Sequence, residues 1–295
     1  MDKPAIGFIG LGLMGSAMAE RLQSLGYAMT VLGNLNRTGV ETAISRGARE
    51  ARTAKELAEA SDVVMLCVAT SEQVESRMRG PEGVIAGLRP GALALDFGTS
   101  LPASTKALGA EVAAAGGQML DAPLGRTPAH AKDGLLNIMG AGDKVAFDRA
   151  RPVLDDLGEN VFHLGPLGTG HAVKLLNNFF GMTVSNAMAE VFAMADKVGV
   201  PRHSVYDAMS AGPLHSGMMD FVKAYAIDGN PDMLAFSVRN AAKDVGYYAR
   251  MAEDAGVETV MGRCAETALR LAIEDGRGDD YVTRQVDFFA KRFGS

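Results

Sequence analysis

The feature that most constrains the fold lies within the first fifteen residues. The apolar run 6–9 leads directly into Gly10-Leu11-Gly12-Leu13-Met14-Gly15, and residues 17–25 follow with a helix-forming pattern. In a strand–turn–helix unit, three glycines at this spacing permit a tight turn, close approach of the backbone to a pyrophosphate, and close packing of helix on strand. The segment therefore predicts a βαβ unit that binds a dinucleotide. The alternative is a glycine-rich turn without a ligand.

Short apolar runs alternate with helical patterns through the rest of the first half. The predicted strands are residues 28–32, 63–68, 92–97 and 118–122. Strands that alternate with helices indicate a parallel sheet, because parallel strands need crossover connections. We therefore predict an α/β Rossmann-type domain over residues 1–165.

The pattern changes after the Gly/Pro-rich segment 165–170. Residues 171–198 have one long, apolar-rich helical pattern, and further helical patterns cover 201–209, 237–255 and 262–274. Glycine and proline mark the ends of elements. We predict an all-helical domain for substrate binding and oligomerisation over residues 166–295, beginning with a long interdomain helix.

The residues after the second predicted strand bear on the choice between NAD and NADP. An acidic residue there would bind the ribose 2′-hydroxyl, whereas an arginine would pair with a 2′-phosphate. The segment contains Asn34, Asn36 and Arg37, and it has no carboxylate before Glu41. This favours NADP and leaves NAD open. In the alternative interpretation, Arg37 is a solvated residue at the start of a helix.

Composition argues against several classes of protein. The chain has 295 residues, 47% of them hydrophobic and 22% charged, with a net charge of −6 and no concentrated Lys/Arg cluster. No stretch approaches the roughly 20 apolar residues of a membrane span, and the N-terminus has no basic signal-peptide region. We therefore expect a cytoplasmic protein with no nucleic-acid or membrane partner.

The metal-binding residue types are few and scattered. Cys67 and Cys264 lie far apart without a CxxC partner, and the five histidines show neither HxH nor HExxH spacing. We expect no metal site and no disulfide, with both cysteines buried and unreactive.

Longer motifs resemble the β-hydroxyacid dehydrogenase family, which includes 3-hydroxyisobutyrate dehydrogenase and tartronate semialdehyde reductase. Residues 7–19 resemble the family's glycine loop. Residues 96–100, Asp-Phe-Gly-Thr-Ser, resemble its Asp-x-Ser-Thr segment, with Gly98 in place of the usual serine. The resemblance covers essentially the whole chain. It implies the fold of 6-phosphogluconate dehydrogenase, in which an all-α domain follows the Rossmann-type domain.

A second segment resembles the family's substrate-binding motif. Residues 121–127 read Asp-Ala-Pro-Leu-Gly-Arg-Thr, and most members have Ser-Gly-Gly where this chain has Gly125, Arg126 and Thr127. The Gly-Arg-Thr form is similar to that of the sulfolactaldehyde reductase branch. A guanidinium can bind an oxyanion at two points, so the motif predicts a substrate with a carboxylate or sulfonate group. The alternative is that Arg126 pairs with a nearby carboxylate of the protein.

A third segment, residues 168–178, resembles the family's catalytic motif. The resemblance implies that Lys174 transfers the proton and that Asn178, one helical turn later on the same face, orients the substrate. A lone helical lysine is normally a solvated surface residue. Here the apolar neighbours 173, 175 and 176 indicate a largely buried helix. His171 is expected, at most, to contact the residues that bind the substrate and not the substrate itself. Lys243, in a segment similar to the family's Lys-Asp-Leu, is expected near the nicotinamide or the substrate.

The resemblance thus implies an NAD(P)-dependent oxidoreductase. It would interconvert a small anionic β-hydroxyacid, or a 3-hydroxy sulfonate, and its semialdehyde, with Lys174 as proton donor and acceptor. Val68 and Thr99 are two further predicted cofactor contacts, and a homodimer or homotetramer is expected. The alternatives are a non-catalytic NAD(P)-sensing protein, and an imine reductase or 6-phosphogluconate-type enzyme of the same fold.

Overall fold

The computed structural model describes residues 3–294 of the chain. The chain divides into two compact units, with the division between Lys174 and Leu175. The sequence-based boundary between residues 165 and 166 precedes a long helix, and the observed division lies inside that helix. The two units are described separately below.

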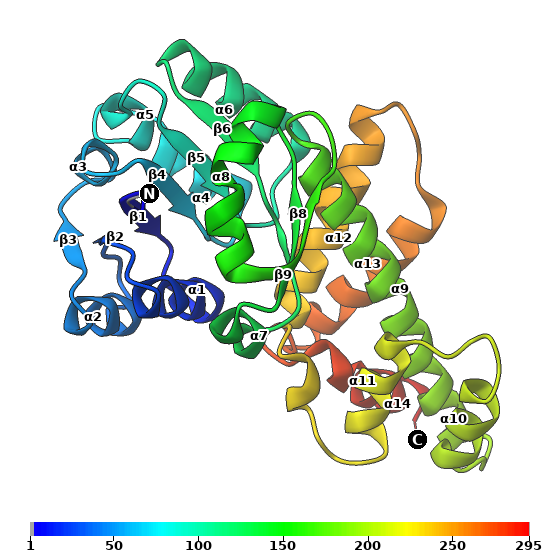
Figure 1. Cartoon of the computed structure of the whole chain (residues 1–295). Coiled ribbons are helices and arrows are strands. Elements are labelled where there is room, and N and C mark those ends of the chain that lie inside the picture. Colours follow the sequence, from blue (N-terminus) through cyan, green and yellow to red (C-terminus); the bar gives the residue numbers. More distant parts are fainter. Residues whose placement is uncertain (1–2, 295) are drawn as a thin grey trace. The chain divides into compact units, whose positions relative to one another are not determined.

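The first unit is built on a six-stranded sheet in the order β3-β2-β1-β4-β5-β6, with every neighbouring pair parallel (Figure 1). The strands are β1 (Ile6–Ile9), β2 (Met29–Leu32), β3 (Arg49–Ala51), β4 (Val63–Leu66), β5 (Leu93–Asp96) and β6 (Gln118–Asp121). This confirms the predicted α/β Rossmann-type domain. Strand β3 was not predicted, because two of its three residues are exposed and charged, as an edge strand allows.

Helices cover both faces of this sheet, so its central strands are buried throughout. Phe8 and Val31 pack on one face, and Ile9 and Leu32 pack on the other, following the two-residue repeat of a strand. The helices on the first face are α1 (Leu13–Ser24), α2 (Thr38–Ser45), α7 (Pro128–Asp133) and α8 (Lys144–Leu157). Those on the second face are α3 (Ala54–Glu59), α4 (Ser71–Met78), α5 (Val84–Gly87) and α6 (Pro102–Ala114).

A second, three-stranded sheet follows the first and was not predicted. It consists of β7 (Leu124–Gly125), β8 (Leu136–Gly140) and β9 (Gly158–His163). Strand β7 is antiparallel to β8, and β9 is parallel to β8. This sheet fixes the position of the predicted substrate motif, because Gly125 is the last residue of β7 and pairs with Asn137 of β8.

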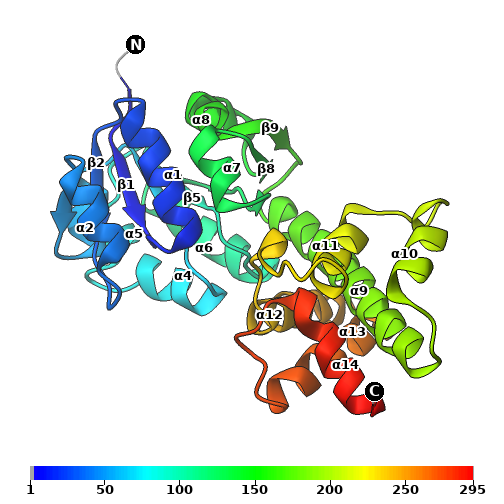
Figure 2. The ribbon, with the colours of Figure 1, turned by 90° about the horizontal axis from the view of Figure 1, so that it is seen from below.

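The second unit contains only helical elements over residues 175–294, which confirms the predicted all-helical region. They are α9 (Thr169–Lys197, which begins in the first unit), α10 (Arg202–Ser210), α11 (Gly217–Ala226), η1 (Asp232–Leu234), α12 (Val238–Asp254), α13 (Val260–Glu274), η2 (Val282–Arg284) and α14 (Gln285–Phe293). Figure 2 shows α12, α13 and α14 beside α9, and their shared core includes Phe192, Val245 and Leu269.

The expectation that α9 is largely buried holds for one side of the helix, and the other side is exposed. Leu175 and Met188 are buried, but Leu176 is 50% exposed and Phe180 is 68% exposed. Apolar composition alone did not reveal that only one side of the helix packs into a core. Among residues 3–294, no helix combines the length and the apolar character needed to cross a lipid bilayer.

Candidate cofactor and active site

The glycine loop follows β1, and its three glycines are required for different reasons. Gly10 has φ +96°, and a Cβ there would overlap the carbonyl oxygen of Cys67 after β4. A Cβ on Gly15 would overlap the carbonyl oxygen of Gly10. Gly12 has an ordinary φ of −75°, and an added Cβ would meet no protein atom within 4 Å. Neither conformation nor packing explains the glycine at position 12, so the open space beside it fits a ligand that approaches the backbone.

The start of α1 is suited to bind an anion. The helix begins at Leu13, no side chain within residues 3–294 caps its first N–H groups, and its first turn contains no acidic residue. Such a terminus has unpaired N–H donors and carries the positive end of the helix dipole. The loop and helix start therefore fit the pyrophosphate of a dinucleotide.

A hollow of about 710 Å³ lies at the carboxyl end of β2, and its lining includes Asn34, Arg37, Glu50 and Arg52. The Arg37 guanidinium is paired with Glu50 of β3, which holds the pKa of that carboxyl below its ordinary value. Glu50 was not predicted as a site residue, since it lies on β3, which was not predicted either.

The other predicted cofactor contacts within the first unit follow strands of the same sheet. Asn34 and Val68 line a neighbouring hollow of about 230 Å³. The side chain of Asn36 instead accepts a hydrogen bond from the backbone N–H of Thr38. Thr99 lies in the loop after β5, where Asp96 accepts a hydrogen bond from the N–H of Gly98.

Lys174 is placed at this edge by the start of α9. The Asp121 carboxylate, at the end of β6, accepts hydrogen bonds from the N–H groups of Gly168 (2.8 Å) and His171 (2.7 Å). Lys174 follows His171 by three residues and is partly buried. All six strands are parallel, so the end of β6 and the glycine loop after β1 lie at the same edge of the sheet.

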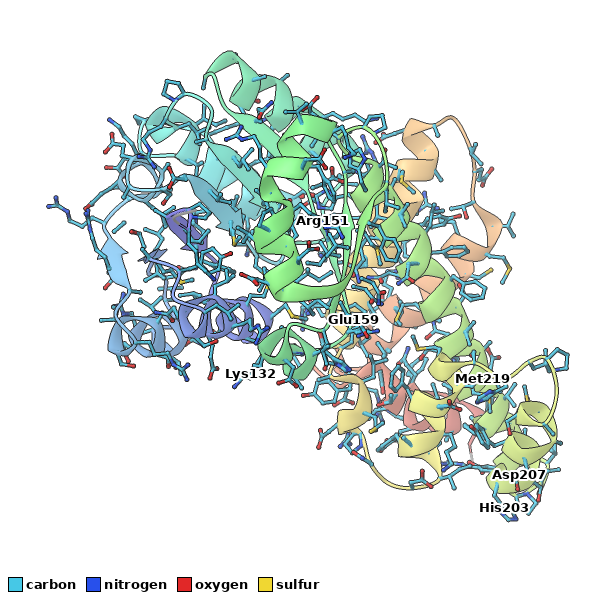
Figure 3. The ribbon with its side chains drawn as sticks, viewed as in Figure 1. Lys132, Arg151, Glu159, His203, Asp207 and Met219 are labelled. Carbon is cyan, nitrogen blue, oxygen red and sulfur yellow. The ribbon has the colours of Figure 1, made fainter. Side chains whose placement is uncertain are left out.

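The substrate motif places Arg126 in a strained conformation. Its φ is +77°, and among residues 3–294 it is the only residue other than glycine with positive φ. Nη1 of Arg126 donates to the carbonyl oxygen of Leu135 (2.6 Å) and to Oε2 of Glu159 on β9 (2.5 Å). Figure 3 labels Glu159. The predicted alternative, pairing with a protein carboxylate, is thus present. Thr127 makes a 2.7 Å hydrogen bond to Nδ1 of His130.

Asn178 and Lys243 belong to one polar network in the second unit. Nδ2 of Asn178 donates to Oδ2 of buried Asp244 (2.6 Å), and its Oδ1 accepts from Asn177. Nζ of Lys243 lies 2.8 Å from Oδ1 of Asp244 and above the Tyr247 ring. Asp244 therefore links the two residues that the sequence singled out, a role that sequence analysis did not assign to it.

The cysteine expectation was wrong for Cys264. It is exposed on α13, whose next residue, Ala265, packs into the core, so the amphipathic helix turns Cys264 to the outside. Burial, helped by the charge of Asp96, raises the pKa of Cys67 to about 12. In residues 3–294, no three His, Cys, Asp or Glu side chains are grouped so as to hold a metal ion.

The fold and the glycine loop define a class of protein. Strand β1 lies between β2 and β4, and the glycine loop follows it at the point where the order of the strands reverses. This is where open parallel sheets bind dinucleotides. The chain is therefore a dinucleotide-binding protein of the Rossmann type.

Comparison with known proteins identifies the family. Residues 5–165 match the family model described as the NAD binding domain of 6-phosphogluconate dehydrogenase. Residues 168–288 match the NAD-binding region of NADP-dependent 3-hydroxyisobutyrate dehydrogenase. The chain belongs to the β-hydroxyacid dehydrogenase family. This confirms the predicted family, fold and NAD(P) cofactor.

Three relatives are similar to the chain over nearly its whole length. NAD-dependent L-serine dehydrogenase of Pseudomonas aeruginosa is 30% identical over 98% of this chain and 97% of its own. The 3-sulfolactaldehyde reductase of Escherichia coli is 31% identical over 93% of this chain and 92% of its own. The structure of Mycobacterium tuberculosis 3-hydroxyisobutyrate dehydrogenase with L-serine has a TM-score of 0.84 at 25% identity, covering 97% of this chain and 99% of its own.

Proposed function

We propose that the chain interconverts a small anionic β-hydroxyacid, or a 3-hydroxy sulfonate, and its semialdehyde, with Lys174 as the proton donor and acceptor. One observation carries this proposal. Asp121 binds the first turn of α9 at the end of β6, which brings Lys174 to the edge of the sheet that also holds the glycine loop. A proton-transfer group and a dinucleotide loop are thereby on one edge of one unit.

The chemistry requires two transfers. The reduced nicotinamide, when bound, supplies hydride to the aldehyde carbon. The Lys174 ammonium then donates its proton to the carbonyl oxygen, where negative charge develops in the transition state. In the opposite direction, neutral Lys174 accepts the hydroxyl proton of the alcohol. Asn178 lies one turn further along α9, on the helix face that bears Lys174, and we assign it to orient the substrate.

We assign the substrate anion to Arg126. A side chain in the left-handed region costs about 1 kcal/mol, and most family members have glycine at this point of the motif. The hydrogen bonds of Arg126 use Nη1 alone, and among residues 3–294 no acceptor binds Nε or Nη2. That edge of the guanidinium offers two parallel N–H donors, the geometry that a carboxylate or sulfonate accepts.

The names of the relatives support a small anionic substrate. One acts on L-serine, a β-hydroxy acid, and another on 3-sulfolactaldehyde. Arg126 favours a substrate with an oxyanion and can bind either a carboxylate or a sulfonate. NADP is the proposed preferred cofactor because of Arg37, and NAD is the alternative.

A substrate panel tests the proposal. Succinic, methylmalonic and tartronic semialdehydes and sulfolactaldehyde would each be assayed with NADH and NADPH by nicotinamide absorbance. At least one pair should turn over, and Lys174→Ala should lower kcat by about 10²–10⁴-fold while retaining NADPH binding. Lys197→Ala, at the exposed end of the same helix, is the matched control and should keep the wild-type rate. Near-wild-type turnover by Lys174→Ala would end the assignment.

The panel also separates the main alternative. A non-catalytic NAD(P)-sensing protein would bind NADPH in a fluorescence titration without turning over any aldehyde. An imine reductase would reduce cyclic imines in preference to the semialdehydes.

We also propose that the protein forms a homodimer or homotetramer. Leu176 and Phe180 lie one turn apart on α9 and are both exposed in the single chain. Adjacent exposed apolar side chains are typical of an interface. Sedimentation equilibrium measures the mass of the assembly, and Phe180→Glu should lower it. A monomeric wild-type protein would contradict the proposal.

A further inference from the structure

The beginning of α9 is held by a carboxylate from a distant part of the chain. Oδ1 and Oδ2 of Asp121 accept the N–H groups of Gly168 and His171, and the whole Asp121 side chain is buried. The first N–H groups of a helix have no partner within the helix, so this carboxylate acts as their cap. A Cβ on Gly170 would overlap the carbonyl oxygen of Met139, so the first turn lies directly against the backbone of β8. The helix start is thus tied to two strands.

A second buried carboxylate lies beside the first. Asp96 and Asp121 are register partners at the ends of adjacent strands β5 and β6. Asp96 is held in place by the N–H of Gly98 on Oδ1 (2.8 Å) and the hydroxyl of Ser100 on Oδ2 (2.7 Å). Two neighbouring carboxylates in a region of low dielectric repel each other and are poorly solvated. Burial is the largest cause that raises the pKa of Asp121, and the charge of His171 opposes it.

The imidazole of His171 lies between these two carboxylates. Nε2 is 3.6 Å from Oδ2 of Asp96, and Nδ1 is 3.8 Å from Oδ2 of Asp121. The ring is fully buried, and its Nε2 has no hydrogen-bond partner among residues 3–294. An unprotonated Nε2 would turn its lone pair toward the Asp96 carboxylate. A proton there converts that repulsion into attraction.

The other ring nitrogen is bonded to α6. Nδ1 lies 2.8 Å from Oγ1 of Thr105, and that hydroxyl also lies 3.2 Å from the carbonyl oxygen of Leu101. The hydroxyl has one proton, and the carbonyl can only accept it. When the hydroxyl donates that proton to Leu101, Nδ1 must donate its own proton to Thr105. With both nitrogens protonated, the ring is a cation that offsets the two carboxylates.

We propose that His171 is a positioning residue for proton transfer: as an imidazolium between Asp96 and Asp121, it fixes the first turn of α9 and hence the direction of Lys174. Residues three apart on a helix lie on one face, so a shift of His171 is transmitted directly to Lys174. His171 is fully buried, so we assign it a role that acts through Lys174. The inference rests on the role of Lys174 given under Proposed function.

Two variants at position 171 test this role. His171→Asn keeps a donor for Thr105 but lacks the charge, and His171→Leu fills much of the volume without polar groups. Small displacements of a catalytic group cost about 100-fold in rate, so kcat should fall by about 10–100-fold in His171→Leu and less in His171→Asn. NADPH affinity should stay near that of the wild type. Equal losses in kcat and NADPH affinity would show a general structural defect and overturn the inference.

A double variant tests whether His171 acts through Lys174. If it does, adding His171→Leu to Lys174→Ala should not lower the residual rate further, because residues that act as a unit are not additive. A full additional loss would overturn the inference. Replacing one carboxylate as well, in Asp96→Asn/His171→Leu, should recover part of the stability lost in His171→Leu, because it removes the uncompensated repulsion.

A measurement on the wild-type protein needs no activity. The ¹⁵N chemical shifts of the His171 ring at pH 7 should show both nitrogens protonated, and a neutral tautomer would overturn the inference. If no substrate turns over, or Lys174→Ala keeps its rate, the proposed function fails. The ¹⁵N shifts of the ring would still measure the charge of His171 in that case, because they do not depend on activity.

Discussion

Arg37, just before α2, and Glu50, in the middle of β3, form a two-point ion pair, with Nη1 2.6 Å from Oε1 and Nη2 3.0 Å from Oε2. The hollow that both residues line is the one predicted to hold the ribose of the cofactor. A 2′-phosphate that binds Arg37 must compete with the Glu50 carboxylate and is repelled by it. A ribose 2′-hydroxyl can instead donate a hydrogen bond to Glu50. Arg37 therefore favours NADP, and Glu50 favours NAD.

The first prediction is that Glu50→Gln shifts the preference toward NADP. The substitution keeps the shape of the side chain and removes the charge that opposes the phosphate. We expect the ratio of kcat/KM for NADPH over NADH to rise about tenfold, equivalent to roughly 1.4 kcal/mol. Steady-state kinetics with both cofactors measures this ratio.

The matched control for this prediction is Glu111→Gln. Glu111 forms a similar ion pair with Arg79, at Nη2 to Oε1 2.7 Å, and lines neither hollow at the end of β2. Its substitution should leave the ratio unchanged. A ratio that stays constant in Glu50→Gln, or moves toward NADH, would remove Glu50 from cofactor selection.

The second prediction concerns the anion site. Arg126→Gly should raise KM for anionic aldehydes strongly, with little effect on NADPH affinity, because the two N–H donors at Nε and Nη2 are lost. Relative to Arg126→Ala, which loses the same hydrogen bonds but keeps a Cβ, Arg126→Gly should be about 1 kcal/mol more stable to urea, because glycine accepts the φ of +77° without strain. Arg126→Ala is the control that loses the donors but retains the strain. An equal effect on substrate and cofactor would place Arg126 outside the substrate site.

Glu159 offers a further test of the same site. It binds only Nη1 of Arg126, so it holds the guanidinium in place without blocking the Nε and Nη2 edge. Glu159→Gln should therefore raise KM for the anionic substrate, by less than Arg126→Gly does. A fall in KM would show that Glu159 competes with the substrate instead of holding Arg126.

The third prediction is that only one of the two thiols reacts rapidly. With a pKa of about 12, Cys67 is a thiolate in about one molecule in 10⁴ at pH 8, and the thiolate is the reactive form. Cys264 is exposed. Titration of the native protein with a chromogenic disulfide at pH 8 should release one rapid equivalent. Cys264→Ser should release none until the protein unfolds, and a rapid equivalent from that variant would contradict the raised pKa of half-buried Cys67.

Local patterns were sufficient to predict most of the fold. The glycine loop, the apolar strands and the helical stretches are each encoded in consecutive residues, so the Rossmann-type sheet and the helical second half could be predicted. The three-stranded sheet could not, because β7 has only two residues and forms through pairing with β8. Strand β3 was missed for a similar reason. Its sequence Arg-Glu-Ala does not favour a strand, and it forms through pairing with β2.

The candidate site was predictable as a set of residues and not as a set of contacts. Arg37 and Arg126 stood out, but their partners Glu50 and Glu159 are far along the chain, on strands that were not predicted. His171 was expected to lie behind Lys174. Its position between Asp96 and Asp121 depends on the register of β5 and β6, which no local pattern records.

The last prediction separates the two kinds of glycine in the loop. Gly15→Ala places a Cβ against the carbonyl oxygen of Gly10 and should destabilise the protein by about 1–3 kcal/mol, since the backbone must move. At Gly12, an added methyl group meets no atom of the described residues within 4 Å, and the φ is one that alanine accepts. The effect of Gly12→Ala on stability should stay below about 1 kcal/mol, the scale of a changed helix cap. Yet its methyl group enters the space that we assign to the pyrophosphate, so NADPH affinity should fall at least about tenfold. Urea unfolding without cofactor and fluorescence titration with NADPH measure the two effects separately. If Gly12→Ala binds NADPH as tightly as the wild type does, the open space at Gly12 does not hold the pyrophosphate.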